Sequence, residues 1–319
     1  MINSQDALPD DAQWRTLTAS PEKRALFGQD LYFREAWADA RAVLHGDPAA
    51  SLSAFALLCA KPDAVAGRRL RPMLDYAIER GFAPVGVAGF AFGRHSMREI
   101  WRYDWHVYTV DRLRFSTLWY TSAPSLMFVL EDRSPEPGIP ASVRLTSLKG
   151  NALASKRGPD DLRSRLAPPN QVLNFVHVTD EPADLIRELG ILLESGARRD
   201  VLRWIRDRPD GAMDAAAAIE ALYASHAAHD LDPRASLRRL RDAGAIEDDA
   251  ARRLEACLSA EEIVDWETLC ALAPSHASAD HRWDFISIAS AVVPRERPLE
   301  GLLRNPDIHD WRRLRQAHA

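Results

Sequence analysis

Cysteine is scarce in this chain, with only Cys59, Cys257 and Cys270 among 319 residues. They lie far apart and fit no metal-binding spacing, which favours a reducing compartment and argues against a zinc site. No apolar run reaches the length that crosses a bilayer, so we expect no membrane association. The first eleven residues are mostly polar and acidic, so no secretory signal is expected. Together, these absences predict a cytoplasmic protein.

An excess of positive charge is also missing. The chain carries 41 lysines and arginines against 46 aspartates and glutamates, for a net charge of -5, which argues against nucleic acid as a partner. The composition is globular, with 46% hydrophobic and 27% charged residues. A chain of this length suits more than one domain. We predict an N-terminal helical extension at residues 1–50, a central domain at 51–195 and a helical accessory domain at 196–319.

Short apolar runs in the central domain predict β-strands. The runs lie at residues 54–60, 82–92, 125–130 and 172–177. Pro84 cannot donate a hydrogen bond to a neighbouring strand, so the second run is expected at the edge of a sheet or at the start of a strand.

The segments between the strands have helical patterns, at residues 67–80, 96–120, 141–149 and 181–194. The order is that of a split βαβ unit. It predicts an α/β (α+β) protein with a ferredoxin-like four-stranded antiparallel sheet, helices on one face of it, and an all-α C-terminal module. In this topology the first and fourth strands are neighbours, which brings the ends of these two strands together.

Polar side chains stand at those two strand ends. Lys61 directly follows the first strand, where a buried ammonium is costly unless an anion meets it. Asn174 and His177 interrupt the fourth apolar run, and Glu188 follows the histidine by eleven residues on a predicted helix. A histidine within reach of a carboxylate suits nucleophilic or acid–base chemistry. The alternative is a core histidine that is satisfied by a neighbour, and the expected closeness of Lys61 favours a site.

Five short motifs in the central domain occur in an order that is known from one protein family. They lie at residues 60–65, 99–103, 156–163, 174–180 and 188–192. The first resembles a Lys-Pro-Asp-Gly-Val sequence after a first strand, and the fourth resembles the signature Asn-x-x-His-Gly-Ser-Asp. With these motifs, residues 54–193 resemble the nucleoside diphosphate kinase family.

The resemblance implies a ping-pong phosphoryl transfer, in which ATP or another nucleoside triphosphate phosphorylates a histidine and a nucleoside diphosphate collects the phosphate. It implies that His177 is the nucleophile, that Glu188 orients its ring with help from Thr179, and that Lys61 assists catalysis. The nucleotide contacts that it implies are Lys61, Tyr103, Arg144, Arg163, Asn174 and Thr179. It also implies Mg²⁺ carried by the nucleotide, with no metal-binding residues, and a homo-oligomer.

The sequence departs from the family pattern at three places. Val178 stands where the family has glycine, and Thr146 stands where the family has a second arginine, with Arg144 two residues earlier. The loop at 150–171 also differs from the pattern. These departures favour an alternative, a catalytically weak nucleotide-binding regulatory or scaffold protein. A third hypothesis is nucleotidyl transfer, which would release pyrophosphate or AMP instead of ADP.

Residues 196–319 do not resemble that family. Helical patterns lie at 198–207, 212–228, 233–243, 247–257, 259–272 and 297–317. We expect this module to dock on the central domain, to bind a protein or small-molecule partner, or to contribute to a substrate pocket. His276, Asp280 and His281 lie close together, but their spacing fits no metal template, so no metal site is expected.

Overall fold

The computed structural model describes residues 8–274, 278–294, 296–297 and 299–317, so His276 lies outside the described residues. Its centre is a four-stranded antiparallel sheet in the order β2-β3-β1-β4. The strands are β1 (Phe55–Ala60), β2 (Phe82–Phe90), β3 (Ser125–Asp132) and β4 (Val176–Val178). This order confirms the predicted ferredoxin-like sheet and the pairing of the first strand with the fourth. Pro84 lies on the edge strand β2, as expected for a residue without an N–H group.

The fourth strand is shorter than the sequence predicts, because residues 172–175 are not part of it. Phe175 has a left-handed backbone with φ of 69°. The carboxylate of Asp63 accepts a hydrogen bond from the Phe175 N–H at 2.7 Å, so that N–H is taken up by a side chain. The chain enters the sheet only afterwards, where His177 pairs with Cys59 of β1.

Both faces of the sheet are covered, which corrects the prediction that helices lie on one face only. Every residue of the central strands β1 and β3 is buried. The helices that pack directly on the strands include α6 (Leu70–Glu79), α9 (Ala141–Lys149), α11 (Pro182–Leu192), α12 (Ser195–Asp207) and α13 (Ala212–Ser225). Trp204 of α12 fits against Gly86, where an added Cβ would lie 2.3 Å from the indole. Part of this cover, α12 and α13, comes from residues beyond 195.

The segment predicted as one helix at 96–120 is broken. It forms α7 (Arg94–Ile100), a 3₁₀ turn η2 (Trp105–Val107) and α8 (Val110–Tyr120). The hydroxyl of Thr109 accepts a hydrogen bond from the Arg112 N–H and so begins α8 as a separate helix. The other short elements of the central domain are α5 (Pro62–Ala66), η3 (Ala154–Lys156) and α10 (Leu162–Leu166).

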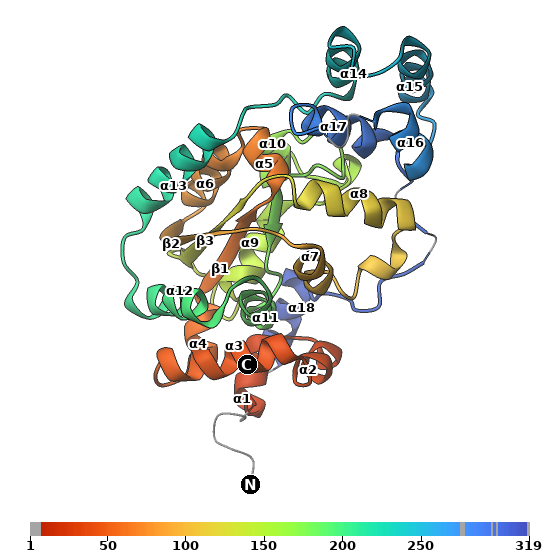
Figure 1. Cartoon of the computed structure of the whole chain (residues 1–319). Helices are drawn as coiled ribbons and strands as arrows, with labels where there is room; N and C mark the ends of the chain where they lie inside the picture. Colours follow the sequence, from red (N-terminus) through yellow and green to blue (C-terminus); the bar gives the residue numbers. More distant parts are fainter. Residues whose placement is uncertain (1–7, 275–277, 295, 298, 318–319) are drawn as a thin grey trace.

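The N-terminal extension is helical, as predicted. It consists of α1 (Asp11–Leu17), α2 (Pro21–Phe27), α3 (Leu31–Val43) and α4 (Pro48–Ser53). The single helix predicted from residue 21 to 44 is interrupted at Asp30, whose carboxylate accepts a hydrogen bond from Phe33 and caps α3. Helix α3 packs against α11 and α12, below the sheet in Figure 1.

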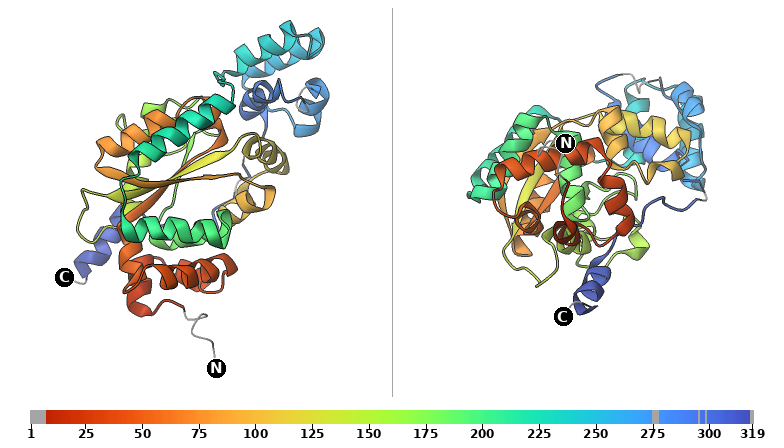
Figure 2. Two further views of the ribbon diagram at one scale, coloured as in Figure 1. Left: turned by 60° about the vertical axis from the view of Figure 1, so that its left-hand side comes forward. Right: turned by 90° about the horizontal axis from the view of Figure 1, so that it is seen from below.

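The remaining helices lie in two separate parts of the molecule. They are α14 (Pro233–Asp242), α15 (Asp248–Ala260), α16 (Trp266–Leu272), α17 (Arg282–Val292) and α18 (Ile308–Ala317). The first four project together at one end of the molecule, and α18 lies at the other end beside the N-terminal helices (Figures 1 and 2). Helix α17 was not predicted, and only the second half of the predicted helix at 297–317 is helical. The domain boundaries at 50/51 and 195/196 stay predictions.

Within the described ranges, no helix combines the length and the apolar character that crossing a membrane requires.

Candidate active site

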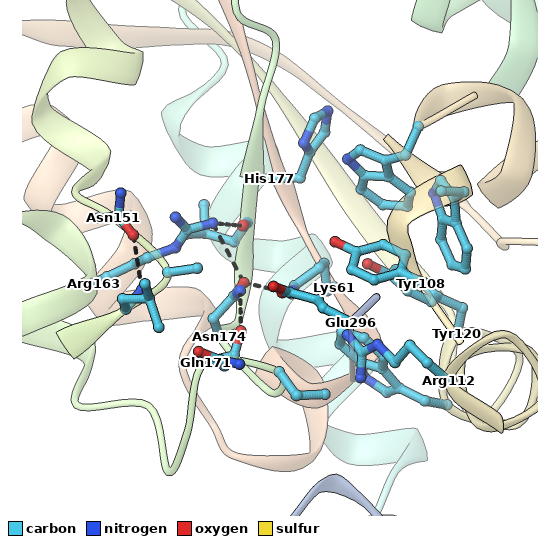
Figure 3. Close-up of a pocket in the computed structure, with 17 residues that line it drawn as sticks. Lys61, Tyr108, Arg112, Tyr120, Asn151, Arg163, Gln171, Asn174, His177 and Glu296 are labelled. Atoms are coloured by element: carbon cyan, nitrogen blue, oxygen red, sulfur yellow. Dashed lines mark hydrogen bonds between the residues drawn. The ribbon is translucent and has the colours of Figure 1, made fainter. Parts of the chain in front are cut away.

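A cavity of about 350 Å³ lies where β1 ends beside β4. Its walls come from both strand ends, from residues 101–120, from the loop around 151–153 and from a distant C-terminal segment (Figure 3). The polar and charged residues that line it are Lys61, Arg112, Asn151, Arg163, Gln171, Asn174, His177 and Glu296. Five aromatic residues complete much of the wall, namely Trp101, Trp105, Tyr108, Trp119 and Tyr120.

Among the described residues, hydrogen bonds reach the imidazole of His177 at one ring nitrogen only. Its Nε2 lies 2.9 and 2.8 Å from the two carboxylate oxygens of Glu188, on α11. A carboxylate only accepts hydrogen bonds, so Nε2 carries the proton and Nδ1 carries the lone pair. No described residue makes a hydrogen bond to Nδ1. Trp101 meets the ring edge-on at 5.2 Å and fixes its orientation further. Nδ1 is therefore the nitrogen that is available as a nucleophile.

Lys61 is almost completely buried, with 3% of its surface exposed. Its Nζ donates a hydrogen bond to Oδ1 of Asn174 at 2.5 Å and lies 4.6 Å from the centre of the Trp119 ring. Burial lowers the pKa of the Lys61 ammonium to about 7; the carboxylate of Asp63 opposes this shift, and Arg163 adds to it by repulsion. A bound anion would place negative charge beside Lys61 and so favour its protonated form.

Arg163, on α10, is the second cation at the cavity floor. It donates to the backbone oxygens of Gly150 at 2.7 Å and Val176 at 3.1 Å. Burial lowers the pKa of its guanidinium to about 10, with repulsion from Arg157 adding to the shift. Its Nε is buried and has no hydrogen-bond partner among the residues that the structure describes. A buried and a half-buried cation in one cavity favour an anionic ligand such as a phosphate.

Asp63 has a structural role behind the cavity. Its carboxylate accepts hydrogen bonds from the Phe175 N–H at 2.7 Å and from Trp119 Nε1 at 3.2 Å. Burial raises the pKa of this carboxyl, and the charge of Lys61 opposes that shift. One side chain thus ties the end of β1 to the approach to β4 and to α8.

The structure brings together Lys61, Arg163, Asn174, His177 and Glu188 of the predicted site residues. Three others do not line the cavity, as the next contacts show. Tyr103 follows the break after α7 and packs on Phe27, with 6.4 Å between the ring centres. Arg144 forms an ion pair with Asp132 at 2.6 Å. The Thr179 hydroxyl accepts a hydrogen bond from the Leu57 N–H at 3.3 Å, inside the sheet.

Other lining residues were missed from the sequence. Arg112 lies 5.4 Å from the ring centre of Trp119 and 5.6 Å from that of Tyr108. Residues 101–120 are rich in aromatic side chains, but the sequence does not show which of them face a cavity. Glu296 had no signal, because it is remote in sequence from every other residue of the cavity.

The comparisons with known proteins found matches to only part of the chain. No family model matches it, and no curated protein matches its sequence. Among solved structures it is similar to the nucleoside diphosphate kinase of Aquifex aeolicus, with 23% identity, a TM-score of 0.36, and coverage of 43% of this chain and 92% of the other. It is also similar to a halophilic nucleoside diphosphate kinase from Halobacterium salinarum in complex with CDP, with 18% identity, a TM-score of 0.35, and coverage of 44% and 91%.

Proposed function

We propose that this protein is a nucleotide-dependent phosphotransferase, in which Nδ1 of His177 takes the γ-phosphate of a nucleoside triphosphate and passes it to a nucleoside diphosphate or another acceptor. One observation supports this most strongly. Glu188 engages Nε2 with both carboxylate oxygens, and so leaves the lone pair of Nδ1 beside a cavity that contains Lys61 and Arg163. A purely structural histidine would not require two cations beside it.

The proposed chemistry needs few moving protons. The Nδ1 lone pair attacks the γ-phosphorus in line, the bond to the β,γ-bridging oxygen breaks, and its electron pair leaves on the nucleoside diphosphate. The Nε2 proton stays between the imidazole and Glu188, whose charge stabilises the phosphorylated ring. Lys61 and Arg163 neutralise charge on the phosphate oxygens, and Mg²⁺ would enter bound to the nucleotide. An anionic oxygen of the acceptor then attacks the phosphorus and releases His177.

A second candidate is a nucleotide-binding protein with slow turnover or none. The contacts of the two cations favour this candidate. The side chain of Asn174 accepts a hydrogen bond from Lys61, and backbone carbonyls accept hydrogen bonds from Arg163. A nucleotide would have to compete with these contacts. Val178, beside His177, is completely buried and paired with Leu58 of β1, which restricts adjustment of the backbone there.

The two candidates differ in one direct test. Purified protein is incubated with γ-labelled ATP and Mg²⁺ and quenched in alkali. We expect an acid-labile, alkali-stable label on the protein, release of ADP, and a ³¹P signal of a phosphohistidine substituted at Nδ1. Bound nucleotide without any label would favour the slow or inactive protein. Release of AMP or pyrophosphate would favour nucleotidyl transfer.

Affinity for nucleotide should fall as pH rises above neutrality. Phosphates beside Lys61 raise its pKa from the value of about 7 in the free protein, so binding takes up a proton above that pH. The positive charge of Lys61 is fully present below the pKa of the free protein. Above that pKa the charge is lost, and the affinity for nucleotide falls by up to about tenfold per pH unit. The phosphates' own ionisation acts in the opposite direction. Calorimetry with ADP across this range, in buffers of different ionisation enthalpy, measures both affinity and proton uptake.

Lys61→Met is the control for this pH dependence, because it removes the titrating group. Its ADP affinity should be lower and should not fall above neutral pH. A wild-type affinity that is constant above pH 7, with no proton uptake, would contradict the assignment.

A further inference from the structure

The connection between α17 and α18 forms part of the cavity. Its described residues between 294 and 302, which we call the strap, run beside residues 103–109. The Thr109 hydroxyl donates to the Pro294 oxygen at 2.7 Å, and the Arg297 N–H donates to the Val107 oxygen at 2.6 Å. Between these contacts, Glu296 and Tyr108 form an antiparallel β-bridge. The strap is thus held to the cavity rim on both sides of Glu296.

The bridge places an aromatic ring beside a carboxylate. Directly opposed residues of an antiparallel pair project their side chains to the same side, and both Glu296 and Tyr108 line the cavity (Figure 3). They belong to its outer part, since Glu296 is exposed and Tyr108 is half-buried. Lys61 and His177, by contrast, are 3% and 9% exposed. The cavity therefore has Lys61 and His177 at its buried end, while its more exposed part contains Tyr108, Glu296 and also Arg112, which lies 5.6 Å from the centre of the Tyr108 ring.

This arrangement orients a nucleotide. Under the proposed function the γ-phosphate meets His177 at the buried end, so the phosphates lie beside Lys61 and Arg163 and not beside the carboxylate of Glu296. The nucleoside then lies at the mouth, where Tyr108 offers a surface for base stacking. A carboxylate accepts two parallel hydrogen bonds. Guanine presents adjacent N1–H and N2–H donors on one edge, whereas adenine presents an acceptor nitrogen beside its amino group.

We propose that Glu296 and Tyr108 recognise the nucleotide base, and that Glu296 makes the site prefer guanine nucleotides. This inference rests on the proposed function, because it assumes that phosphates occupy the inner end of the cavity. It assigns a specificity role to the strap, which lies outside the part of the sequence that resembles nucleoside diphosphate kinases.

Equilibrium binding tests the preference without requiring turnover. GDP, IDP and ADP are titrated into the full-length wild type, Glu296→Gln and Glu300→Gln. Inosine keeps the N1–H donor of guanine but lacks its 2-amino group, so IDP isolates one of the two hydrogen bonds. We expect wild type to bind GDP about tenfold more tightly than ADP, with IDP between them. In Glu296→Gln, the affinities for GDP and ADP should become about equal.

Glu300→Gln is the matched control, because it removes the same charge from the same strap. Glu300 is exposed and does not line the cavity, so its variant should keep the wild-type ratio. Tyr108→Leu should weaken all three nucleotides by a similar factor of about ten, because stacking does not distinguish their edges. Unchanged affinities in Tyr108→Leu would overturn the stacking role.

The remaining outcomes separate this inference from the proposed function. Equal affinity of wild type for GDP and ADP would overturn the guanine preference and leave the phosphotransferase proposal standing. An equal loss of affinity for all three nucleotides in Glu296→Gln would place Glu296 on the ribose and also overturn the preference. Failure of every nucleotide to bind would reject both proposals.

Discussion

His177→Ala should abolish the alkali-stable label from γ-labelled ATP, a loss of about 10³-fold or more in labelling rate. The substitution removes the only nitrogen that the proposal makes a nucleophile. ADP should still bind, because Lys61 and Arg163 remain in the cavity. Alkaline-quench labelling gives the first result, and calorimetry with ADP gives the second.

Two variants show whether such a loss is specific. His177→Ala leaves the carboxylate of Glu188 buried without its partner, which costs stability. His177→Gln keeps an N–H donor for that carboxylate and should also be unlabelled, with less loss in melting temperature. His229→Ala removes a histidine that is likewise paired with a carboxylate, 2.9 Å from Asp284, but outside the cavity. It should be labelled normally. Full labelling of folded His177→Ala would reject the proposed nucleophile.

Glu188→Ala should slow phosphorylation of His177 by about 100-fold. Without the carboxylate the imidazole loses the group that fixes the Nε2–H tautomer, and the phosphorylated ring loses a stabilising charge. ADP affinity should change little, because Glu188 does not line the cavity. Single-turnover labelling in rapid-quench experiments measures the rate.

Glu188→Gln separates orientation from charge. The amide oxygen of glutamine still accepts from Nε2–H, but the negative charge is gone, so we expect a smaller loss of about tenfold. If both variants phosphorylate at the wild-type rate, Glu188 has no part in the mechanism. If both lose ADP binding as well, Glu188 acts through the shape of the cavity.

The closeness of Lys61, His177 and Glu188 follows from strand order, while the roles of these residues stay predictions. Lys61 and His177 stand at the ends of two strands that this topology makes neighbours, and the structure pairs those strands. Glu188 follows on the next helix and reaches the imidazole as expected. Short apolar runs and the order of the elements can be read along the chain, so a single sequence contains enough information for them.

The outer wall of the site was predicted poorly, because it depends on where helices break and how loops return. The expected helix at 96–120 is interrupted between Ile100 and Val110, and Tyr103, inside this interruption, packs on Phe27. Arg112 enters the cavity instead. Arg144 is neutralised by Asp132, a contact between side chains that no motif reveals.

The sequence alone determined the four strands, their antiparallel order, and the histidine, carboxylate and lysine that meet where two of them end. Only the tertiary structure decided what encloses that site. Helices α12 and α13, beyond residue 195, add cover to β2 and β3, and the strap returns from α17 to place Glu296 at the cavity mouth. The physical reason is the range of the interactions. Burial patterns repeat every two to four residues along the chain, whereas the contact between Glu296 and Tyr108 depends on how separate helices pack.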